Sequence, residues 1–420
     1  MMLAGLRHSK LLRSGSIYLG FSVLTSLIKF FVMPVLSHYL SPEDMGVVGL
    51  FNVLLQLLAP LIGLSMNSIL SRSYYNRTDF SALVGSGFIL VTVMSCVVSM
   101  VISLTPEQVF DYFDYPKGLF LLTTAAAFFT INLASYLAIL QMVERPVHWG
   151  VVTLLGVILD LCLTFGLLWL SDLTFMARII GVSLANTVCC LVAMWMVRQQ
   201  IEFRIGEWRE HARYFLKLGV PLIVVALSGW GLNMFDRILL QQMLDLKQVG
   251  YYALAYTLAS PMLVLGTSFS RAWAPSAYKS LADHQEMELF RKSLWVAASF
   301  TFFAVALAVI GPVLFRHLIS PEFYPCLGLI PWLVGAMLVA SWHKLWMPYL
   351  LHWGETRFMS LVTGAALVVN IGLNLLWIPS YGVTAAAIAS LMSFLVMTGL
   401  TFWDVRRKAM LKTGMSYERT

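Results

Sequence analysis

Two charged side chains lie inside long apolar runs of the sequence, Lys29 in LTSLIKFFVMP and Asp160 in GVILDLCL. A charge in a bilayer interior costs roughly 2.5–3.5 kcal/mol, so each is a candidate for function. Pro34 follows Lys29 and favours a kink, because proline removes a backbone hydrogen bond. A cation on a kinked helix that faces a cavity suits an anionic ligand. The alternative is that Lys29 extends its stem to the membrane surface.

Asp160 has three readings, which stay open. It neutralises Lys29, it binds a coupling proton or sodium ion, or it is a buried acid without a role. Asp236 and Arg237 form a second acid and base at the end of another apolar run. Adjacent helix positions point about 100° apart, so we expect each to find a different partner. The alternative for this pair, and for Arg178 at the start of a run, is anchoring at the membrane interface.

Further cations and amides lie at the ends or inside of apolar runs. Arg72 and Arg271 each follow a serine at such an end, where a guanidinium binds phosphate bidentately or anchors the helix. Lys344 lies in ASWHKLWMP between Trp342 and Trp346, aromatic side chains that stack on ligands or lie at interfaces.

Four asparagines lie within the apolar runs. Asn132 and Asn186 are candidates for hydrogen bonds to a polar ligand in a cavity. Asn370 and Asn374 are four residues apart on one helix face, so they favour hydrogen bonds that lock helix to helix.

Composition identifies the environment of these residues. The chain has 420 residues, of which 59% are hydrophobic and 12% charged. Soluble domains carry roughly 25% charged residues, so the sequence predicts an integral membrane protein. The net charge of +7 is read as membrane topology rather than nucleic-acid binding. The five cysteines form no C-x-x-C pair, and GxxxxGK[ST] and H-E-x-x-H are absent, so we expect no cofactor and no metal site.

Twelve apolar runs have the length that a spanning helix needs, about 20 residues. We expect cytoplasmic surface helices over 198–217 and 271–292. The runs are Ser16–Leu36, Gly46–Ile69, Val84–Leu104, Gly118–Met142, Trp149–Leu170, Phe175–Val197, Leu218–Leu240, Val249–Ser270, Ser293–Leu314, Leu329–Leu350, Met359–Ile378 and Val383–Trp403.

Loop charge predicts the orientation of these spans. Lysines and arginines fall about four to one on one set of loops, which also includes Arg77 and Arg419. Cytoplasmic loops collect such cations, so twelve spans with both termini in the cytoplasm fit the pattern.

An internal repeat relates the two halves of the chain. LSPEDMGVVGLF, residues 40–51, aligns without a gap on LDLKQVGYYALA, residues 244–255, so that Gly46 matches Gly250. Because six spans is an even number, the halves share an orientation, which predicts two parallel-related six-helix lobes around a central cavity. The predicted parts are a first lobe over 1–197, a cytoplasmic linker over 198–217, a second lobe over 218–403 and a basic tail over 404–420.

The same stretches carry a family resemblance. LSPEDMGVVGLF, VGYYALAYTLASP and VVNIGLNLLWIPSYGVTAAAIAS resemble the polysaccharide transporter group. That group includes the O-antigen flippases called Wzx and belongs to the multidrug/oligosaccharidyl-lipid/polysaccharide exporter superfamily. The resemblance implies flipping of an undecaprenyl-diphosphate-linked oligosaccharide between the leaflets of the bacterial inner membrane, not an enzymatic reaction.

Under that resemblance the candidate residues acquire roles. The substrate or cavity set is Lys29, Arg72, Arg178, Arg237, Arg271, Lys344, Asn132 and Asn186. Asp160 and Asp236 are the candidates for ion coupling or charge pairing. Pro34, Gly46, Gly250, Asn370 and Asn374 are structural or hinge candidates.

Partners and competing functions follow from the same resemblance. The expected partners are the lipid-linked glycan, membrane lipids, a proton or sodium ion, and polysaccharide polymerase and chain-length proteins, without nucleic acid. Two alternatives stay open: a drug/cation antiporter of the same superfamily, and a membrane-embedded glycan polymerase or transferase. The antiporter would favour an acidic cavity, and the polymerase would need acidic or histidine catalysts on a long outward loop.

Overall fold

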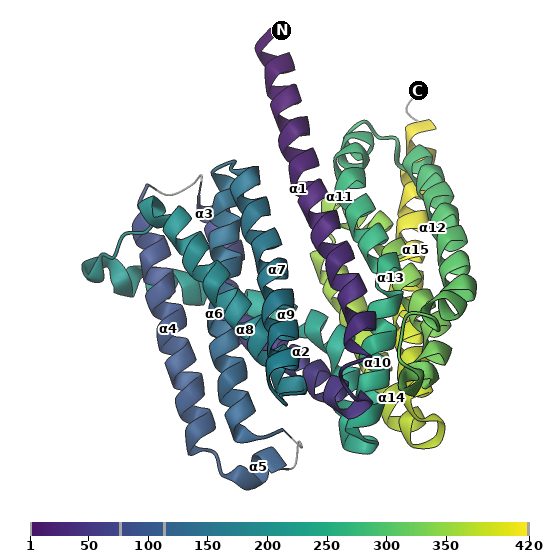
Figure 1. The fold of residues 1–420 in the computed structure, drawn as a ribbon. Coiled ribbons are helices and arrows are strands. Elements are labelled where there is room, and N and C mark those ends of the chain that lie inside the picture. The colour runs from purple at the N-terminus through teal and green to yellow at the C-terminus, as the bar shows by residue number, and fades with distance from the viewer. Residues whose placement is uncertain (1, 75–77, 112–114, 418–420) are drawn as a thin grey trace. The chain divides into compact units, whose positions relative to one another are not determined.

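The computed structural model describes residues 2–74, 78–111 and 115–417, and over these ranges the chain is helical, without a strand (Figure 1). Arg77 and Arg419, counted above among the cytoplasmic cations, lie outside the described residues. The earlier helices are α1 Met2–Leu36, α2 Pro42–Gly63, α3 Met66–Ser73, α4 Phe80–Leu104, α5 Glu107–Asp111, α6 Lys117–Met142, α7 Pro146–Leu170 and α8 Phe175–Met196. The later ones are α9 Trp208–Met243, α10 Leu246–Ala259, α11 Pro261–Ala282, α12 Glu286–Phe315, α13 Ile330–His352, α14 Thr356–Tyr381 and α15 Val383–Tyr417, and three short 3-10 helices are η1 Arg198–Gln200, η2 Ile205–Glu207 and η3 Pro321–Leu329.

The prediction of an all-helical, multi-pass membrane protein is confirmed. Within the described ranges, 10 helices are long and apolar enough to cross a membrane, or up to 11 if α10 and α11 form one span. A shorter apolar helical stretch, Gly20–Leu36, covers most of the first predicted run. The full count of twelve stays a prediction.

The second predicted span of each half is broken rather than continuous. The run Gly46–Ile69 divides into α2 and α3 at Leu64 and Ser65, whose φ angles are 46° and 54°. Backbone in this left-handed region ends an α-helix. The run Val249–Ser270 divides into α10 and α11, which are bent by 44° at a break before Pro261. Proline has no amide hydrogen to continue the helical ladder, which accounts for the second break.

The predicted surface helices of the linker are only partly right. Residues 198–207 contain the two 3-10 helices η1 and η2 with extended chain between them, and α9 begins at Trp208. Residues 208–217 are helical as the first turns of this long helix, which runs without interruption into the seventh predicted span.

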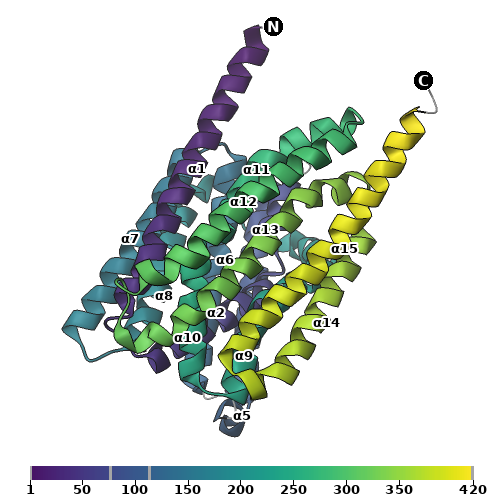
Figure 2. The same cartoon turned by 90° about the vertical axis from the view of Figure 1, so that its right-hand side faces the viewer.

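The chain forms two compact units. The first contains residues 1–32 and 47–230, and the second contains residues 33–46 and 231–420. In the first unit α8 packs on α7 and α6, and α6 also packs on α4 and α3 (Figure 1). In the second unit α15 packs on α14 and α13, and α13 also packs on α12 and α11 (Figure 2).

These two packing schemes correspond helix by helix. The repeat relates five helices of the first unit to five of the second, in the order α3, α4, α6, α7, α8 and α11, α12, α13, α14, α15. Under this correspondence the α7–α8 pair matches α14–α15, and the α6–α8 pair matches α13–α15. The α4–α6 and α3–α6 pairs match α12–α13 and α11–α13 in the same way. Two copies of one ancestral bundle would give this pattern, so it supports the predicted duplication. The predicted lobe and linker boundaries remain a prediction.

The repeated corner brings its two glycines together within the second unit. A Cβ added to Gly46 would overlap the carbonyl oxygen of Leu246, and a Cβ added to Gly250 would overlap the carbonyl oxygen of Pro42. Pro42 and Leu246 are equivalent in the repeat, so the contact is reciprocal, as in a twofold-symmetric interface. The glycines therefore allow the first turns of α2 and α10 to cross with their backbones in contact.

The two helices of this crossing are also capped at equivalent positions. The hydroxyl oxygen of Ser41 accepts a hydrogen bond from the amide of Asp44 at 3.1 Å, while the Asp44 carboxylate accepts one from the Ser41 amide at 3.2 Å. At the matching start of α10, the carboxylate of Asp245 accepts a hydrogen bond from the amide of Gln248 at 2.8 Å. Side-chain capping of this kind fixes where a helix begins, which holds the glycines at the crossing point.

Replacement of either glycine by alanine is expected to destabilise the protein. Gly46→Ala and Gly250→Ala each push a methyl group into a backbone carbonyl that has no rotamer to move, and such overpacking costs about 1–3 kcal/mol. The check is thermal unfolding in detergent. The matched control is Gly372→Ala in α14, where an added Cβ meets nothing within 4 Å, so helix propensity should raise stability by up to about 1 kcal/mol. Equal melting temperatures for the three variants would contradict the crossing.

Candidate functional site

The first charged cluster lies between α7 and α8 in the first unit. A carboxylate oxygen of Asp160 forms an ion pair with the guanidinium of Arg178, and both side chains are 13% exposed. Thr164, one turn after Asp160, donates its hydroxyl to the same carboxylate oxygen at 3.3 Å and accepts from Arg178 at 3.2 Å. The antiparallel pairing of α7 with α8 brings these residues together. An ion pair with this additional hydrogen bond is the arrangement that makes a charge tolerable at this depth.

Lys29 adds a second cation to this cluster. Its side chain is exposed on α1, and its ammonium group lies within electrostatic range of both Asp160 and Arg178. The direct partner of Asp160 is thus Arg178, while Lys29 contributes charge from a neighbouring helix. Two cations and one acid leave the cluster with a net positive charge, which favours an anionic ligand. Pro34 lies near the end of the same helix, two residues before its last residue, Leu36.

The second charged cluster is buried in the second unit. The carboxylate of Asp236 accepts hydrogen bonds from the Tyr252 hydroxyl, from the Ser390 hydroxyl at 3.5 Å and from the backbone amide of Arg237 at 2.9 Å. Asp236 is 2% exposed. These donors come from α9, α10 and α15, so one acid ties three helices together.

Arg237 is equally enclosed. Its guanidinium carbon lies 4.6 Å from the ring centre of Tyr256 and 5.4 Å from that of Tyr252, within the range of cation–π contacts. It donates to the backbone oxygen of Asn233 at 3.0 Å. The expectation that Asp236 and Arg237 each find a different partner is confirmed, since each makes its shorter contacts with other groups. The two side chains also approach each other, because an Arg237 nitrogen lies 3.8 Å from a carboxylate oxygen of Asp236.

A third group of cations lies on α11 and α13 of the second unit. Arg271 is exposed and lies within electrostatic range of half-buried Lys344. The proposed stacking of Trp346 on a ligand is wrong, because this side chain is 3% exposed and its indole nitrogen donates to Ser293 at 2.9 Å. Trp342 likewise donates to the backbone oxygen of Ala297 at 3.1 Å. Both indoles join α13 to α12.

The asparagines take two kinds of position. Asn374 donates to the side-chain oxygen of Asn370 at 3.1 Å, and Asn370 donates to Ser393 on α15 at 3.0 Å, so this pair joins α14 to α15. Asn132 is buried and donates to the backbone oxygen of Phe128 at 2.8 Å. Half-buried Asn186 donates to Thr130 at 3.0 Å.

The predicted residue Arg72 is exposed at the end of α3, as its position after an apolar run suggests.

Several other residues of the clusters were not predicted from the sequence. Tyr252, Ser390 and Thr164 gave no comparable signal, because tyrosine, serine and threonine are common in membrane helices. A cluster of Asp79, Glu207 and His211 was also missed, although the four-residue spacing of Glu207 and His211 is a recognisable pattern on a helix face.

Comparison with known proteins places the chain among polysaccharide biosynthesis proteins. A family model described as polysaccharide biosynthesis protein matches residues 11–281. Lsg locus putative protein 1 of Haemophilus influenzae is 20% identical over 339 residues, which cover 79% of each chain. An uncharacterized membrane protein of the same organism is 20% identical over 377 residues, which cover 86% of this chain and 89% of the relative.

Solved transporter structures share the fold. The inward-facing conformation of a multidrug resistance MATE family transporter of the MOP superfamily superposes with a TM-score of 0.73 at 14% identity, over 95% of this chain and 99% of that one. The lipid II flippase MurJ in its inward closed conformation gives 0.73 at 13% identity, over 94% and 89%. At such identities the likeness shows the fold alone. The chain is therefore a multi-pass membrane protein that belongs to the polysaccharide biosynthesis protein family and has the fold of MOP-superfamily transporters.

Proposed function

We propose that this protein is a flippase that moves a polyprenyl-diphosphate-linked oligosaccharide, an O-antigen or related surface polysaccharide repeat unit, from the inner to the outer leaflet. The observation that carries the proposal is the net positive cluster of Lys29, Arg178 and Asp160. A diphosphate is the one strongly anionic part of such a lipid, and a guanidinium or ammonium binds phosphate through charge-assisted hydrogen bonds. The membership in a polysaccharide biosynthesis family agrees with this cargo.

The remaining cations have places in the same scheme. Exposed Arg72 and Arg271 receive the diphosphate as it enters from the cytoplasmic leaflet, and Lys344 lies within electrostatic range of Arg271 on the same route. Half-buried Asn186 contacts the sugars, while the polyprenyl tail stays in lipid. Asn132 is fully buried in the first unit and is therefore assigned a structural role instead. The two lobes alternate in access around a central cavity, as transporters built from repeats do.

The energy for transport comes from the membrane. The sequence carries no nucleotide-binding motif, and a membrane potential of 100 mV is worth roughly 2.3 kcal/mol per charge. An inside-negative potential drives an anion outward, and uptake of a proton or sodium ion at Asp160 or Asp236 adds to that force. The proposal places the protein in the bacterial inner membrane with both termini in the cytoplasm, working with polymerase and chain-length proteins.

Drug/cation antiport is the second candidate, favoured by the fold shared with multidrug transporters. An antiporter binds cations, so it should keep its acids available. Here Asp160 is paired with Arg178, and Asp236 accepts hydrogen bonds from Tyr252 and Ser390. An exposed Lys29 beside the first acid would also repel a cationic drug.

Ligand binding tests the proposed cargo directly. A short-chain polyprenyl-diphosphate oligosaccharide, at about 100 times its dissociation constant, should raise the free energy of unfolding in detergent by about 2.7 kcal/mol. The matching monophosphate should bind more weakly, because it has one phosphate fewer for the cationic cluster. Stabilisation by a cationic dye, without any effect of the diphosphate, would favour antiport instead.

A further inference from the structure

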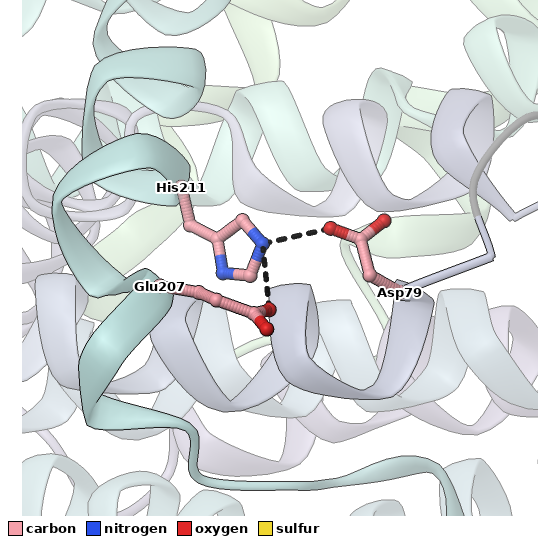
Figure 3. Close-up of side chains that lie close together, drawn as sticks. All are labelled: Asp79, Glu207 and His211. Carbon is pink, nitrogen blue, oxygen red and sulfur yellow. Dashed lines mark hydrogen bonds and ion pairs between the residues drawn. The ribbon is translucent and has the colours of Figure 1, made fainter.

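A buried histidine connects the start of α9 to the start of α4 within the first unit. His211 is 1% exposed, and both nitrogens of its ring contact residues at the start of α4. Figure 3 shows the contact with Asp79. Nδ1 lies 2.8 Å from the Ser86 hydroxyl, and Nε2 lies 2.9 Å from a carboxylate oxygen of Asp79. Asp79 and Ser86 are seven residues apart, two turns along one helix face, so α4 holds the imidazole at both ends.

The carboxylate of Asp79 does not cap α4, although Asp79 occupies the position where an aspartate commonly does so. Asp79 occupies the N-cap position of α4, where an aspartate normally accepts a hydrogen bond from an amide of the first turn. In this protein the side chain makes no capping hydrogen bond and points at His211 instead. The Asp79 carboxylate therefore holds the imidazole of His211 and does not stabilise the first turn of α4 as a cap.

Glu207 brings a second carboxylate to the same ring nitrogen. One of its oxygens lies 3.9 Å from Nε2 of His211 (Figure 3). The other lies 3.5 Å from Arg204. A distance of 3.9 Å is too long for a hydrogen bond. The hydrogen bonds of His211 with Asp79 and Ser86 therefore do not explain why the Glu207 carboxylate lies beside this ring nitrogen. The ligand atoms of Asp79, Glu207 and His211 nevertheless all lie within 4.8 Å of one another.

The surrounding chain holds these three residues in place. The backbone amide of Glu202 donates to the carbonyl oxygen of Ser81 at 3.0 Å. A Cβ on Gly85 would overlap the carbonyl oxygen of Glu202, so this glycine lets the linker lie directly on α4. The guanidinium of Arg204 donates to Glu202 at 2.9 Å and lies 3.5 Å from Glu207. Within this linker, Glu207 is the residue that brings a carboxylate next to the imidazole.

We propose that Asp79, Glu207 and His211 bind a divalent cation of the zinc class, which fastens the linker to α4. One imidazole nitrogen and two carboxylate oxygens are ligands that Zn²⁺ accepts, with water in the fourth position. Without a bound ion, Nε2–H donates to the Asp79 carboxylate and Nδ1 accepts from the Ser86 hydroxyl. Metal binding requires the other tautomer, in which Nδ1–H donates to Ser86 and the lone pair of Nε2 is left for the ion. Metal-bound histidines are generally oriented by such a hydrogen bond from the other ring nitrogen.

The observed spacing needs only a small adjustment to hold the ion. Two ligands of a tetrahedral zinc ion are roughly 3.3 Å apart, given metal–ligand bonds of about 2.0–2.1 Å. The Asp79 oxygen is closer to Nε2 than this and the Glu207 oxygen is farther, at 2.9 and 3.9 Å. Ion binding requires the two carboxylates to rotate, so that their oxygens move by a few tenths of an ångström, up to about 0.6 Å, relative to Nε2. Mg²⁺ suits this nitrogen-containing set poorly, since it prefers octahedral oxygen ligands.

Zinc titration of the purified full-length protein, with a competing fluorescent indicator in detergent, tests the proposal. We expect one saturable Zn²⁺ site per chain, no competition by Mg²⁺, and slower tryptic cleavage after Arg198 and Arg204 when zinc is bound. Glu207→Gln should weaken zinc affinity by at least about tenfold, and Ser86→Ala by about 10- to 100-fold. His211→Gln should abolish the site.

Glu202→Gln is the matched control, because Glu202 is an exposed acid of the same linker outside the three ligands. Its zinc affinity should equal that of the unmodified protein. Glu207→Gln removes no hydrogen bond to His211 and only an exposed ion pair with Arg204, so the metal-free unfolding equilibrium constant should change by less than about fivefold, or about 1 kcal/mol. Weaker zinc binding then reports the ion rather than the fold. Zinc binding that is absent, or that survives both Glu207→Gln and His211→Gln, would overturn the proposal and leave His211 as a hydrogen-bonded lock.

Discussion

Asp236→Ala is expected to destabilise the protein by about 3–5 kcal/mol, the range for removing one partner of a buried charge pair. The substitution leaves the guanidinium of Arg237, which is 5% exposed, without its neighbouring carboxylate. It also leaves the hydroxyls of Tyr252 and Ser390 without their shared acceptor. The loss should appear as a lower melting temperature in detergent and a lower amount of protein in the membrane.

A matched control separates burial from the loss of an acid as such. Asp245→Ala removes an exposed N-cap at the start of α10 and should cost only about 1 kcal/mol. The double variant Asp236→Ala, Arg237→Met should be more stable than Asp236→Ala alone, because it no longer buries an unpaired cation. If Asp236→Ala melts at the temperature of the unmodified protein, Asp236 does not hold the three helices together. A folded Asp236→Asn variant that has lost ion-dependent transport would instead favour a coupling role.

Lys29→Ala is expected to leave the protein folded and to weaken its transport of a diphosphate lipid. The side chain is exposed, so stability should change by no more than about 0.5 kcal/mol. A hydrogen bond to a charged group is worth about 1.5–3 kcal/mol, which corresponds to roughly a ten- to hundredfold loss of affinity for the cargo. Asp160 keeps its ion pair with Arg178 in this variant, so the loss would report Lys29 itself.

The comparison variants for Lys29 are one that keeps the charge and one that removes a different lysine. Lys29→Arg should retain most of the transport, whereas Lys29→Gln should behave as Lys29→Ala does. Lys217→Ala removes an exposed lysine of α9, outside the cluster, and should have no effect. Surface polysaccharide made at the normal rate by Lys29→Ala, at equal protein level, would show that Lys29 does not contact the cargo.

Helix positions were predictable because a bilayer imposes a length and a composition on every span. The run Val84–Leu104 lies within α4, and Phe175–Val197 coincides with α8 to one residue. The breaks between α2 and α3 and between α10 and α11 were missed, because apolar composition continues through them. Pro261 was visible as a signal, whereas the left-handed backbone at Leu64 and Ser65 has no residue type that announces it.

Partners of the charged residues were harder to predict than the residues themselves. Depth in an apolar run singled out Lys29 and Asp160, because charge is rare there. Asp236 was singled out with Arg237 at the end of such a run. The direct partner of Asp160 is Arg178, which depends on the register between α7 and α8 and cannot be read from either run alone. Tyr252 and Ser390 reach Asp236 from helices far apart in the sequence. The reciprocal contact of Gly46 and Gly250 is an exception, since the repeat already marked both positions.

Translocation by the purified protein in liposomes tests the proposed flippase function most directly. The assay uses labelled polyprenyl-diphosphate oligosaccharide, an imposed membrane potential, and a cationic dye as competing cargo. The account predicts that the unmodified protein moves the labelled lipid between leaflets, that Lys29→Ala is at least about tenfold slower, and that the dye is not transported. Efflux of the dye without movement of the lipid would contradict the account and identify a cation antiporter.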